Sequence, residues 1–436
     1  VFELALTDYN IYHARDDKRF QFYVKPFYQI STNGKKLGQF FSPSNKASLA
    51  VREDGTGDID PIWFNVISAS GTSYSSTLCL RPQRQVTGGV LTFYASLDCM
   101  WDRLAHFWLL ANTAVMGSFN KIQVRETKSA AAGTMAGFAN MSQGLNNPAF
   151  CAGRISCKNV NKGGLDDIQV KLGYNAYLCE NNTGHVAPYF VFTIPTGTKP
   201  KSKYLFEPLV GTNHASVGVG LNTDYVFNVC GDHNVSLLGD LKYRYVFAGT
   251  ERRSFDLVNG GDWSRYLDVV TQAEPLNTLS GINYFTKYAK VTPQSTIDLW
   301  LAAHYTVCDW DVEFGYSLWW RQREKLALKC CNTTSLGLGV FDMGAVCSQI
   351  ITSANGATIA DSIANGSVLS NGLFQTLTTA DLNLCSAIQP SALSNKIYLA
   401  GAWHHDSFCN NHPLLVGLGT SYEFGSKCNA LSQFAV

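Results

Sequence analysis

The segment from Thr292 to Leu328 constrains the fold more than any other part of the chain. It reads TPQSTIDLWLAAHYTV, then CDWD, then VEFGYSLWWRQREKLAL: two long runs of alternating apolar and polar residues around a short acidic turn. Because side chains alternate across a strand, we expect a long β-hairpin with one apolar and one charged face. Strands of soluble proteins usually have about five or six residues, whereas strands that cross a membrane need about nine to eleven. The hairpin therefore favours a sheet that spans a membrane.

The composition supports this interpretation. Charged residues make up 15% of the 436 residues, against about a quarter in ordinary soluble domains, and aromatic residues make up 12%. Mean hydropathy is −0.04, and no run approaches the roughly 18 continuous apolar residues of a membrane helix. These values are typical of a barrel with apolar residues outside and polar residues inside, with a large soluble β protein as the alternative. A net charge of +1 gives no footprint for nucleic acid, so no nucleic-acid partner is expected.

Alternating runs recur along the whole chain, separated by short and long connections in turn. We therefore expect an all-β fold: a single transmembrane antiparallel β-barrel of about twelve strands over residues 1–436, with short periplasmic turns and long extracellular loops. The expected strands are Arg19–Ser31, Gly88–Met100, Phe107–Glu126, Leu165–Leu178, His185–Thr198, His214–Val229, Asn234–Ala248, the two strands of the opening hairpin, Lys396–Ser407, His412–Gly425 and Ala430–Val436, the last of them incomplete. The expected long loops span residues 32–84, 127–164, 258–286 and 329–392. Residues 1–17 form an N-terminal segment that could enter the lumen; no signal peptide precedes Val1, which begins a mature form or a fragment.

By the same alternation, one set of polar side chains faces the lumen. The expected pore-lining residues are Lys25, Lys171, Asp224, Asp240, Lys242, Arg244, Asp298, His304, Asp311, Glu313, Arg321, Arg323, Lys396 and Glu423. Two interpretations stay open: these charges set the ion preference of a narrow pore, or they pair into a network that fills the lumen. The alternation changes parity near Asn120–Ile122, which predicts a β-bulge there.

Aromatic residues near the strand ends predict girdles at the two membrane interfaces. The expected outward set is Tyr28, Tyr225, Phe227, Tyr243, Tyr245, Trp310, Trp320, Trp403 and Tyr422. Burial in a soluble core is the alternative for each of them taken alone.

The 13 cysteines indicate an oxidising compartment, such as the periplasm or the cell surface, and their odd number leaves at least one without an intramolecular partner. Five lie at expected short turns on the periplasmic rim: Cys99, Cys179, Cys230, Cys308 and Cys409. The expected long loops hold Cys79 and the disulfide candidates Cys151, Cys157, Cys330, Cys331, Cys347 and Cys385. Cys151 and Cys157 enclose AGRIS and are expected to form a small disulfide, while the others staple the last long loop. The spacing is not that of zinc ligands, so no metal is expected.

The segment GLDDIQVKLGYNAY, followed by APYFVFTIPTGTK, resembles Gram-negative outer-membrane β-barrel porins, in particular the family that includes the phenol-degradation porins. It is distantly similar to the long-chain fatty-acid transporter barrels. The similarity rests on GLDD at residues 164–167 and PTG at residues 195–197, and covers about residues 164–248. The cysteine content also resembles that of chlamydial major outer-membrane proteins, which implies that rim cysteines crosslink to envelope partners. These resemblances imply a bacterial outer-membrane location of the Gram-negative type. They supply no functional residue, and the N-terminal hatch of the fatty-acid transporters is not recognisable.

Catalytic signals are weak. The run His404-His405-Asp406-Ser407 contains the residue types of a hydrolase, but alternation would place neighbours on opposite faces, and GxSxG, HExxH and GxxxxGK[ST] are absent. We therefore expect no enzyme activity and no cofactor. The expected function is porin-like passive diffusion of small solutes, with outer-membrane lipid as the surroundings. The alternatives are an abundant structural surface protein crosslinked through cysteines to itself or to envelope proteins, and a transporter of hydrophobic compounds.

Overall fold

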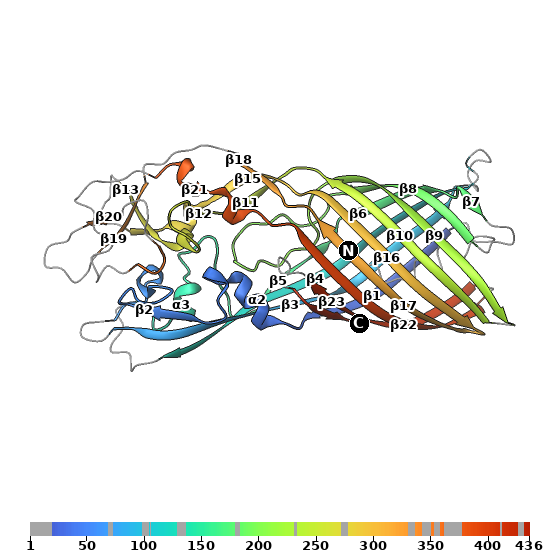
Figure 1. Ribbon diagram of the computed structural model, residues 1–436, viewed down its shortest axis with the longest axis horizontal. Coiled ribbons are helices and arrows are strands. Elements are labelled where there is room, and N and C mark those ends of the chain that lie inside the picture. The colour runs from blue at the N-terminus through green and yellow to red at the C-terminus, as the bar shows by residue number, and fades with distance from the viewer. Residues whose placement is uncertain are drawn as a thin grey trace.

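The computed structural model describes residues 20–68, 73–97, 104, 106–128, 137–178, 184–230, 233–271, 278–329, 336–341, 350–352, 358–361, 377–409, 412–425 and 431–436. Its main feature is a closed antiparallel barrel of twelve strands, seen from the side in the right half of Figure 1. This confirms the expected fold class and strand number. No helix among the described residues is long and apolar enough to cross a membrane.

The barrel strands follow one another around the wall almost in chain order. They are β1 (Phe20–Ser31), β3 (Ser75–Ser96), β4 (Phe107–Lys128), β6 (Ile168–Tyr174), β8 (Gly184–Ile194), β9 (Ser216–Cys230), β10 (His233–Val246), β16 (Gln294–Val307), β17 (Trp310–Arg321), β22 (Ala392–Cys409), β23 (His412–Gly425) and β24 (Gln433–Ala435). β5 (Val160–Leu165) continues the wall above β6, and β7 (Tyr177–Leu178) pairs with β8. The three residues of β24 pair with both β23 and β1, and β1 pairs with β3, so the sheet closes on itself.

The hairpin that dominates the sequence forms as its alternation predicts. β16 and β17 pair from Thr296 opposite Arg321 to Val307 opposite Trp310, and only Cys308 and Asp309 lie between them. Outward side chains such as Phe314, 58% exposed, form an apolar outer wall, while the polar side chains of the other face are turned inward. Alternating faces follow from the pleat of a strand, and an apolar outer face is what lipid requires.

The outward aromatic residues also lie where alternation puts them. Tyr28, Tyr225, Phe227, Tyr243, Tyr245, Trp310 and Tyr422 are exposed on the outer wall, and Trp320 and Trp403 are partly exposed. Aromatic rings in such positions suit the membrane interfaces.

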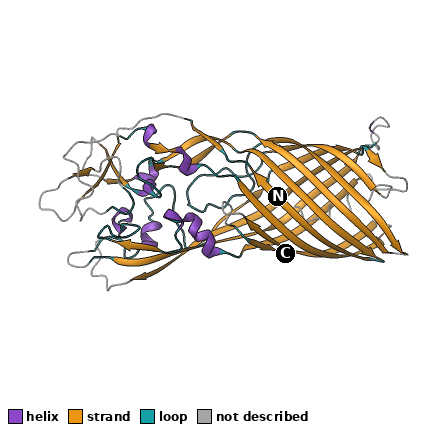
Figure 2. Ribbon diagram, viewed as in Figure 1, coloured by secondary structure: helices purple, strands orange, loops and turns teal. Residues whose placement is uncertain are grey.

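At the end of the barrel opposite the β16–β17 turn, the connections fold into a separate region, which we call the head (Figure 1, left half). Its strands are β2 (Leu49–Arg52), β11 (Gly249–Ser254), β12 (Asp256–Leu257), β13 (Asp268–Thr271), β14 (Thr278–Ser280), β15 (Thr286–Thr292), β18 (Lys325–Leu328), β19 (Leu336–Phe341), β20 (Ile350–Thr352) and β21 (Leu382–Asn383). Its helices are α2 (Gly34–Phe41), α3 (Met141–Leu145) and the 3₁₀ turns η1 (Pro43–Asn45), η2 (Pro61–Phe64), η5 (Ser264–Tyr266), η6 (Gly281–Asn283), η8 (Thr379–Asp381) and η9 (Leu384–Ala387), all of which lie outside the barrel (Figure 2).

The head has a hydrophobic core of its own. Phe64, Phe150, Trp263 and Tyr266 pack together with ring centroids 5.4 to 6.4 Å apart, although three separate connections supply them. Aliphatic residues from β2, β3, α3, β13 and β15 complete this core. The segments predicted as long loops are therefore, in their described parts, a packed domain-like structure.

β3 and β4 extend from the barrel into the head, and here three expectations are wrong. β3 begins at Ser75, within the predicted first loop, and Cys79 lies in this strand rather than in a loop. The predicted bulge near Asn120–Ile122 is also absent: β3 and β4 pair in unbroken register from Ser76–Lys128 to Ser96–Trp108. The apparent change of parity marks the place where β4 leaves the lumen, because Ser118 and Asn120 face the lumen while Ile122 on the same face joins the head core.

Candidate functional site: the barrel lumen

The structure places the expected pore-lining residues on the inner side of the barrel, and most of them are enclosed. The buried residues are Lys171, Asp224, Asp240, Lys242, Arg244, His304, Asp311 and Glu313. The partly exposed residues are Lys25, Asp298, Arg321, Lys396 and Glu423, and Arg323 is exposed beyond the end of β17. Burying a charge is costly unless it is paired and hydrogen-bonded. The contacts of these groups therefore decide what the lumen can do.

One cluster gathers around Asp240 of β10. Its Oδ1 accepts a hydrogen bond of 2.7 Å from the Tyr189 hydroxyl, and its Oδ2 accepts one of 3.4 Å from the Asn222 amide. Lys171 Nζ lies 3.8 Å from Oδ2 and 5.0 Å from the centre of the Tyr189 ring. A single carboxylate thus links four strands, β6, β8, β9 and β10, across the interior.

A second cluster lies on the next part of the wall. Asp298 Oδ2 accepts a hydrogen bond of 3.0 Å from Arg244 Nη2 and lies 3.9 Å from Lys242 Nζ. Two cations share one carboxylate, whose side chain keeps 18% of its surface exposed. The carboxylate of this cluster is therefore partly reached by solvent.

The third cluster surrounds His304 of β16. Its Nε2 lies 3.0 Å from Asp311 Oδ1 and its Nδ1 lies 3.3 Å from Glu313 Oε2. Glu313 Oε1 also accepts a 2.6 Å bond from the Tyr398 hydroxyl, which in turn accepts one of 2.8 Å from Trp300 Nε1. The cluster joins β16, β17 and β22, and no set of three His, Cys, Asp or Glu side chains in the described part of the chain is arranged to hold a metal ion.

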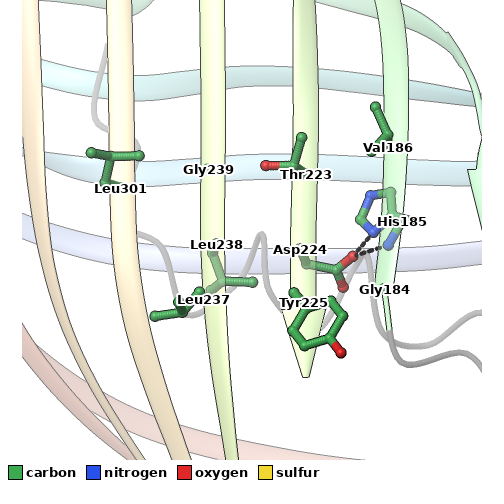
Figure 3. Close-up of a pocket in the computed structure, with 10 residues that line it drawn as sticks. All are labelled: Gly184, His185, Val186, Thr223, Asp224, Tyr225, Leu237, Leu238, Gly239 and Leu301. Carbon is green, nitrogen blue, oxygen red and sulfur yellow. Dashed lines mark hydrogen bonds and ion pairs between the residues drawn. The ribbon is translucent and has the colours of Figure 1, made fainter. Parts of the chain in front are cut away.

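His185 and Asp224 form a further ion pair between β8 and β9, and His185 Nε2 lies 2.9 Å from Asn222 Oδ1. This pair adjoins a pocket of about 410 Å³, drawn in Figure 3. The pocket lies at Gly239, where the outward side chains of Tyr225, Leu237 and Leu301 surround it. The pocket is therefore a groove in the apolar outer wall, next to the pair of His185 and Asp224.

Large aromatic side chains fill the space between these clusters by lying flat on inward glycines. Trp108 covers Gly173, Tyr189 covers Gly220 and Tyr398 covers Gly315, and in each case a Cβ on the glycine would come within 2.1 Å of the ring or its hydroxyl. Only glycine allows such a close approach. The aromatic residues were not among the expected lumen residues, although glycines on the inward parity of a strand are a signal in the sequence that a ring packs there.

The connection between β8 and β9 folds into the upper lumen. Val210 is fully buried there and packs against the inward residues Phe27, Val86, Ala114 and Met116. We call residues 196–213 the inserted segment.

Asp167 holds the inserted segment in place. Its carboxylate accepts hydrogen bonds from the backbone N–H of Gly197 (2.9 Å) and from the N–H and hydroxyl of Thr212 (both 2.7 Å). The Asn213 N–H, at 3.2 Å, is shared by both oxygens. The two short motifs of the sequence, GLDD and PTG, therefore meet here, because the second aspartate of the first binds the glycine of the second. The two motifs together hold the inserted segment against the barrel wall.

The cysteines of the described region are free thiols. Cys151 and Cys157 are both exposed and are not bonded to each other: Cys151 Sγ lies 3.9 Å from the Ala149 carbonyl, and Cys157 Sγ lies 3.2 Å from the Ser142 hydroxyl. Cys385 accepts a 3.5 Å bond from Arg323 Nη2, and Cys308 is exposed in the β16–β17 turn. Cys99, Cys179, Cys330, Cys331 and Cys347 and the segment 1–17 lie outside the described residues, as do the side chains of Cys230, Cys409 and the run 404–407.

No family model matches the sequence, and no curated protein matches it. Among solved structures, a Pseudomonas aeruginosa FadL homologue aligns over 96% of this chain and 90% of its own, with 9% identity and a TM-score of 0.25. The loop L8 deletion mutant of OmpT, an outer-membrane protein of Vibrio cholerae, aligns over 95% and 97% of the two chains with 9% identity and a TM-score of 0.20. In-vitro folded OmpT of the same organism gives 11% identity, 97% coverage of each chain and a TM-score of 0.17. TM-scores this low carry no argument about activity. The closed barrel, its apolar outer wall and its polar interior define the chain as a membrane-spanning β-barrel protein.

Proposed function

We propose that this protein is a narrow channel for passive diffusion of small polar solutes, in an outer membrane of the Gram-negative type. The observation that carries the proposal is the polar inner face that runs along the barrel from the His304 cluster to Asp298. A barrel with an apolar outer wall and a hydrophilic interior is the architecture of diffusion channels. The inserted segment supplies a constriction near the mouth.

The charge pairs bear on both interpretations that the sequence left open. Asp240 is paired with Lys171, and His304 contacts both Asp311 and Glu313, which supports a filled lumen at those levels. Asp298 is partly exposed beside Lys242 and Arg244, which supports a solute path next to it. We infer a narrow path whose width is set by paired charges and by Val210. A transporter of hydrophobic compounds is less favoured, because this interior is lined with charges.

Single-channel conductance in a planar bilayer tests the proposal. We expect discrete ohmic steps from the purified full chain, with and without reductant. Asp298→Asn should shift the reversal potential in a salt gradient toward anion selectivity, because it removes a negative charge that lies beside Lys242 and Arg244. Asp58→Asn is the matched control, since Asp58 lies in the head, where it pairs with Lys46. Silence under both redox conditions would sink the channel proposal.

A structural role is the second candidate, and the exposed thiols favour it. Cys151, Cys157 and Cys385 lie on the head surface with no disulfide partner in the described region. Exposed thiols in an oxidising compartment can link neighbouring molecules. This candidate predicts large oligomers on non-reducing gels that disappear in the triple Cys→Ser variant, whereas a simple channel migrates as the same species with and without reductant.

A further inference from the structure

The three-stranded sheet β11–β15–β18 extends the barrel wall beyond the membrane. β10 ends at Val246 and β11 begins at Gly249; β15 ends at Thr292 and β16 begins at Gln294; β17 ends at Arg321 and β18 begins at Lys325. β10, β16 and β17 are neighbours in the wall, and β11, β15 and β18 pair in the corresponding order. Figure 1 shows the three short strands at the head end of those barrel strands. The sheet therefore stands directly above a lipid-facing part of the wall.

The register of this sheet separates its two faces. Glu251 pairs with Ala289, and both are buried against the head. Arg252 pairs with Tyr288 on the opposite face, where Tyr288 is 59% exposed. Lys290 and Lys325 follow on that same face, because side chains two residues apart, or directly opposite on a neighbouring strand, share a face.

The charged residues of this outward face are all basic. Lys290, Lys325 and Lys329 are exposed, and Lys329 Nζ reaches the hydroxyl of Thr250 on the same face at 3.3 Å. The Arg252 guanidinium lies 5.9 Å from the centre of the Tyr288 ring, which holds the cation over an aromatic surface. Glu251 is the one acidic residue of these three fully described strands, and it is bound to His214 and Arg253 on the other face.

Below this face lies an apolar belt. Tyr243, Tyr245 and Phe247 are exposed on the outer side of β10 and just beyond its end. Tyrosines in this position mark the boundary between hydrocarbon and headgroups. Long basic side chains just above such a boundary meet the charged layer of the lipid.

We propose that the outward face of the β11–β15–β18 sheet binds lipid headgroups that carry net negative phosphate. Charge complementarity and continuity with the lipid-facing wall select this occupant over a second protein. Guanidinium and ammonium groups bind phosphate oxygens through charge-assisted hydrogen bonds. The proposal is independent of whether the lumen conducts.

Native mass spectrometry of the detergent-solubilised full chain tests it. The protein is mixed with equal amounts of phosphatidylglycerol and phosphatidylcholine of the same acyl chains, and the retained lipids are counted. We expect phosphatidylglycerol to be enriched, and less so at high salt. Each basic residue near an anionic surface contributes roughly a fivefold preference, so Arg252→Gln/Lys290→Gln/Lys325→Gln should lose about 100-fold in relative affinity.

Two variants and one competitor separate the outcomes. Lys35→Gln/Lys36→Gln/Lys158→Gln removes the same charge from exposed positions elsewhere and should keep the enrichment. Arg252→Lys/Lys290→Arg/Lys325→Arg changes the same three side chains but keeps their charge, and it should retain the phosphatidylglycerol enrichment. Retention here would assign the loss in the Gln variant to charge and not to substitution at these positions. Equal retention of the two lipids by the wild type, or an unchanged preference in the Gln variant, would overturn the proposal. Displacement of the lipid by inorganic phosphate, but not by chloride at equal ionic strength, would assign the face to free phosphate instead.

Discussion

The barrel and the head have opposite interiors, although two strands run through both. On the inward face of β4, Ser118 and Asn120 lie in the lumen, while Ile122 and Val124 a few residues further contact the core of the head. The outward face changes in the reverse sense, from the exposed Val115 to the exposed Arg125. The surroundings explain the reversal. In lipid the outer face of the barrel must be apolar, whereas in water the apolar side chains of the head are buried in its interior. The change of polarity along β4 thus indicates where the membrane-facing part of the strand ends.

The two interiors are stabilised by different forces. The head buries aromatic and aliphatic side chains away from water, which is favourable in proportion to the apolar area removed. The lumen buries charges, whose pairing only offsets the cost of desolvation. Truncation of a head residue should therefore leave a cavity, and truncation of a lumen residue should leave an unpaired charge.

The largest effect is expected at the centre of the head core. Phe64→Ala removes a fully buried ring that packs against Phe150, Trp263 and Tyr266, and should cost about 4 kcal/mol of head stability. Limited proteolysis should then cut the head while the barrel keeps its heat-modifiable migration on gels. Phe314→Ala, on the lipid-facing wall, is the control and should leave both unchanged. Simultaneous unfolding of the barrel would show that the two regions are one cooperative unit.

The next effect concerns the lumen. Asp240→Ala removes the carboxylate beside the buried Lys171 ammonium and the acceptor of the hydrogen bond from the Tyr189 hydroxyl, and should cost about 3 kcal/mol. The double variant Lys171→Met/Asp240→Leu should cost clearly less, because it removes the charges together. Thermal unfolding in detergent measures both. If the double variant is as unstable as the single one, packing rather than charge pairing governs this part of the lumen.

The barrel could be predicted from the sequence wherever lipid imposes the alternation. β16 and β17 alternate cleanly because their outward residues contact hydrocarbon, and this also identifies the inward charges from Asp298 to Arg321. The first half of β3 lacks that signal. Its outward positions include Arg81, Gln83 and Gln85, because this half lies beyond the apolar wall, and its sequence therefore resembles that of a loop.

The head and the inserted segment could not be predicted, for a different reason. Phe64, Phe150 and Tyr266 meet through contacts between distant parts of the chain, and no local periodicity records such contacts. The same holds for Asp167: the GLDD motif is visible in the sequence, but its bonds to Thr212 and Asn213 depend on how the chain returns from β8. Contacts of this kind become visible only in three dimensions.

A smaller effect is expected where the head and the lumen meet. Asp167→Ala removes the acceptor of the N–H groups of Gly197, Thr212 and Asn213, and should cost about 2 kcal/mol locally. If the inserted segment is the constriction, its release should raise the single-channel conductance. Asp58→Ala, which removes a carboxylate bonded to the Ala50 N–H in the head, is the matched control. A conductance equal to that of the wild type would mean that the constriction lies elsewhere.

The smallest effect depends on pH and concerns His214, at the base of the head. Its Nδ1 lies 2.8 Å from the Phe247 carbonyl and its Nε2 lies 2.7 Å from the Glu251 carboxylate, so both ring nitrogens face acceptors, which favours the charged form of the ring. Burial lowers the pKa of His214, but the hydrogen bonds to Glu251 and Phe247 and the charges of Glu251 and Glu324 outweigh it, so that this pKa is raised. Burial acts to raise the pKa of Glu251, but His214 and Arg253 outweigh it, so that this pKa is lowered.

These two shifts define a pH window for the link between His214 and Glu251. The contribution of His214 is complete below its ordinary pKa of 6.5 and is lost as pH rises through the raised value. The contribution of Glu251 is complete above its ordinary pKa of 4.5 and is lost as pH falls through the lowered value. His214→Gln should therefore lower the free energy of unfolding by about 1 kcal/mol between the two ordinary pKa values of 4.5 and 6.5, and by less at alkaline pH. The melting temperature of the wild type, measured from acid to alkaline pH, should converge on that of the variant at high pH. Parallel curves over the whole range would mean that His214 acts through packing and not through its charge.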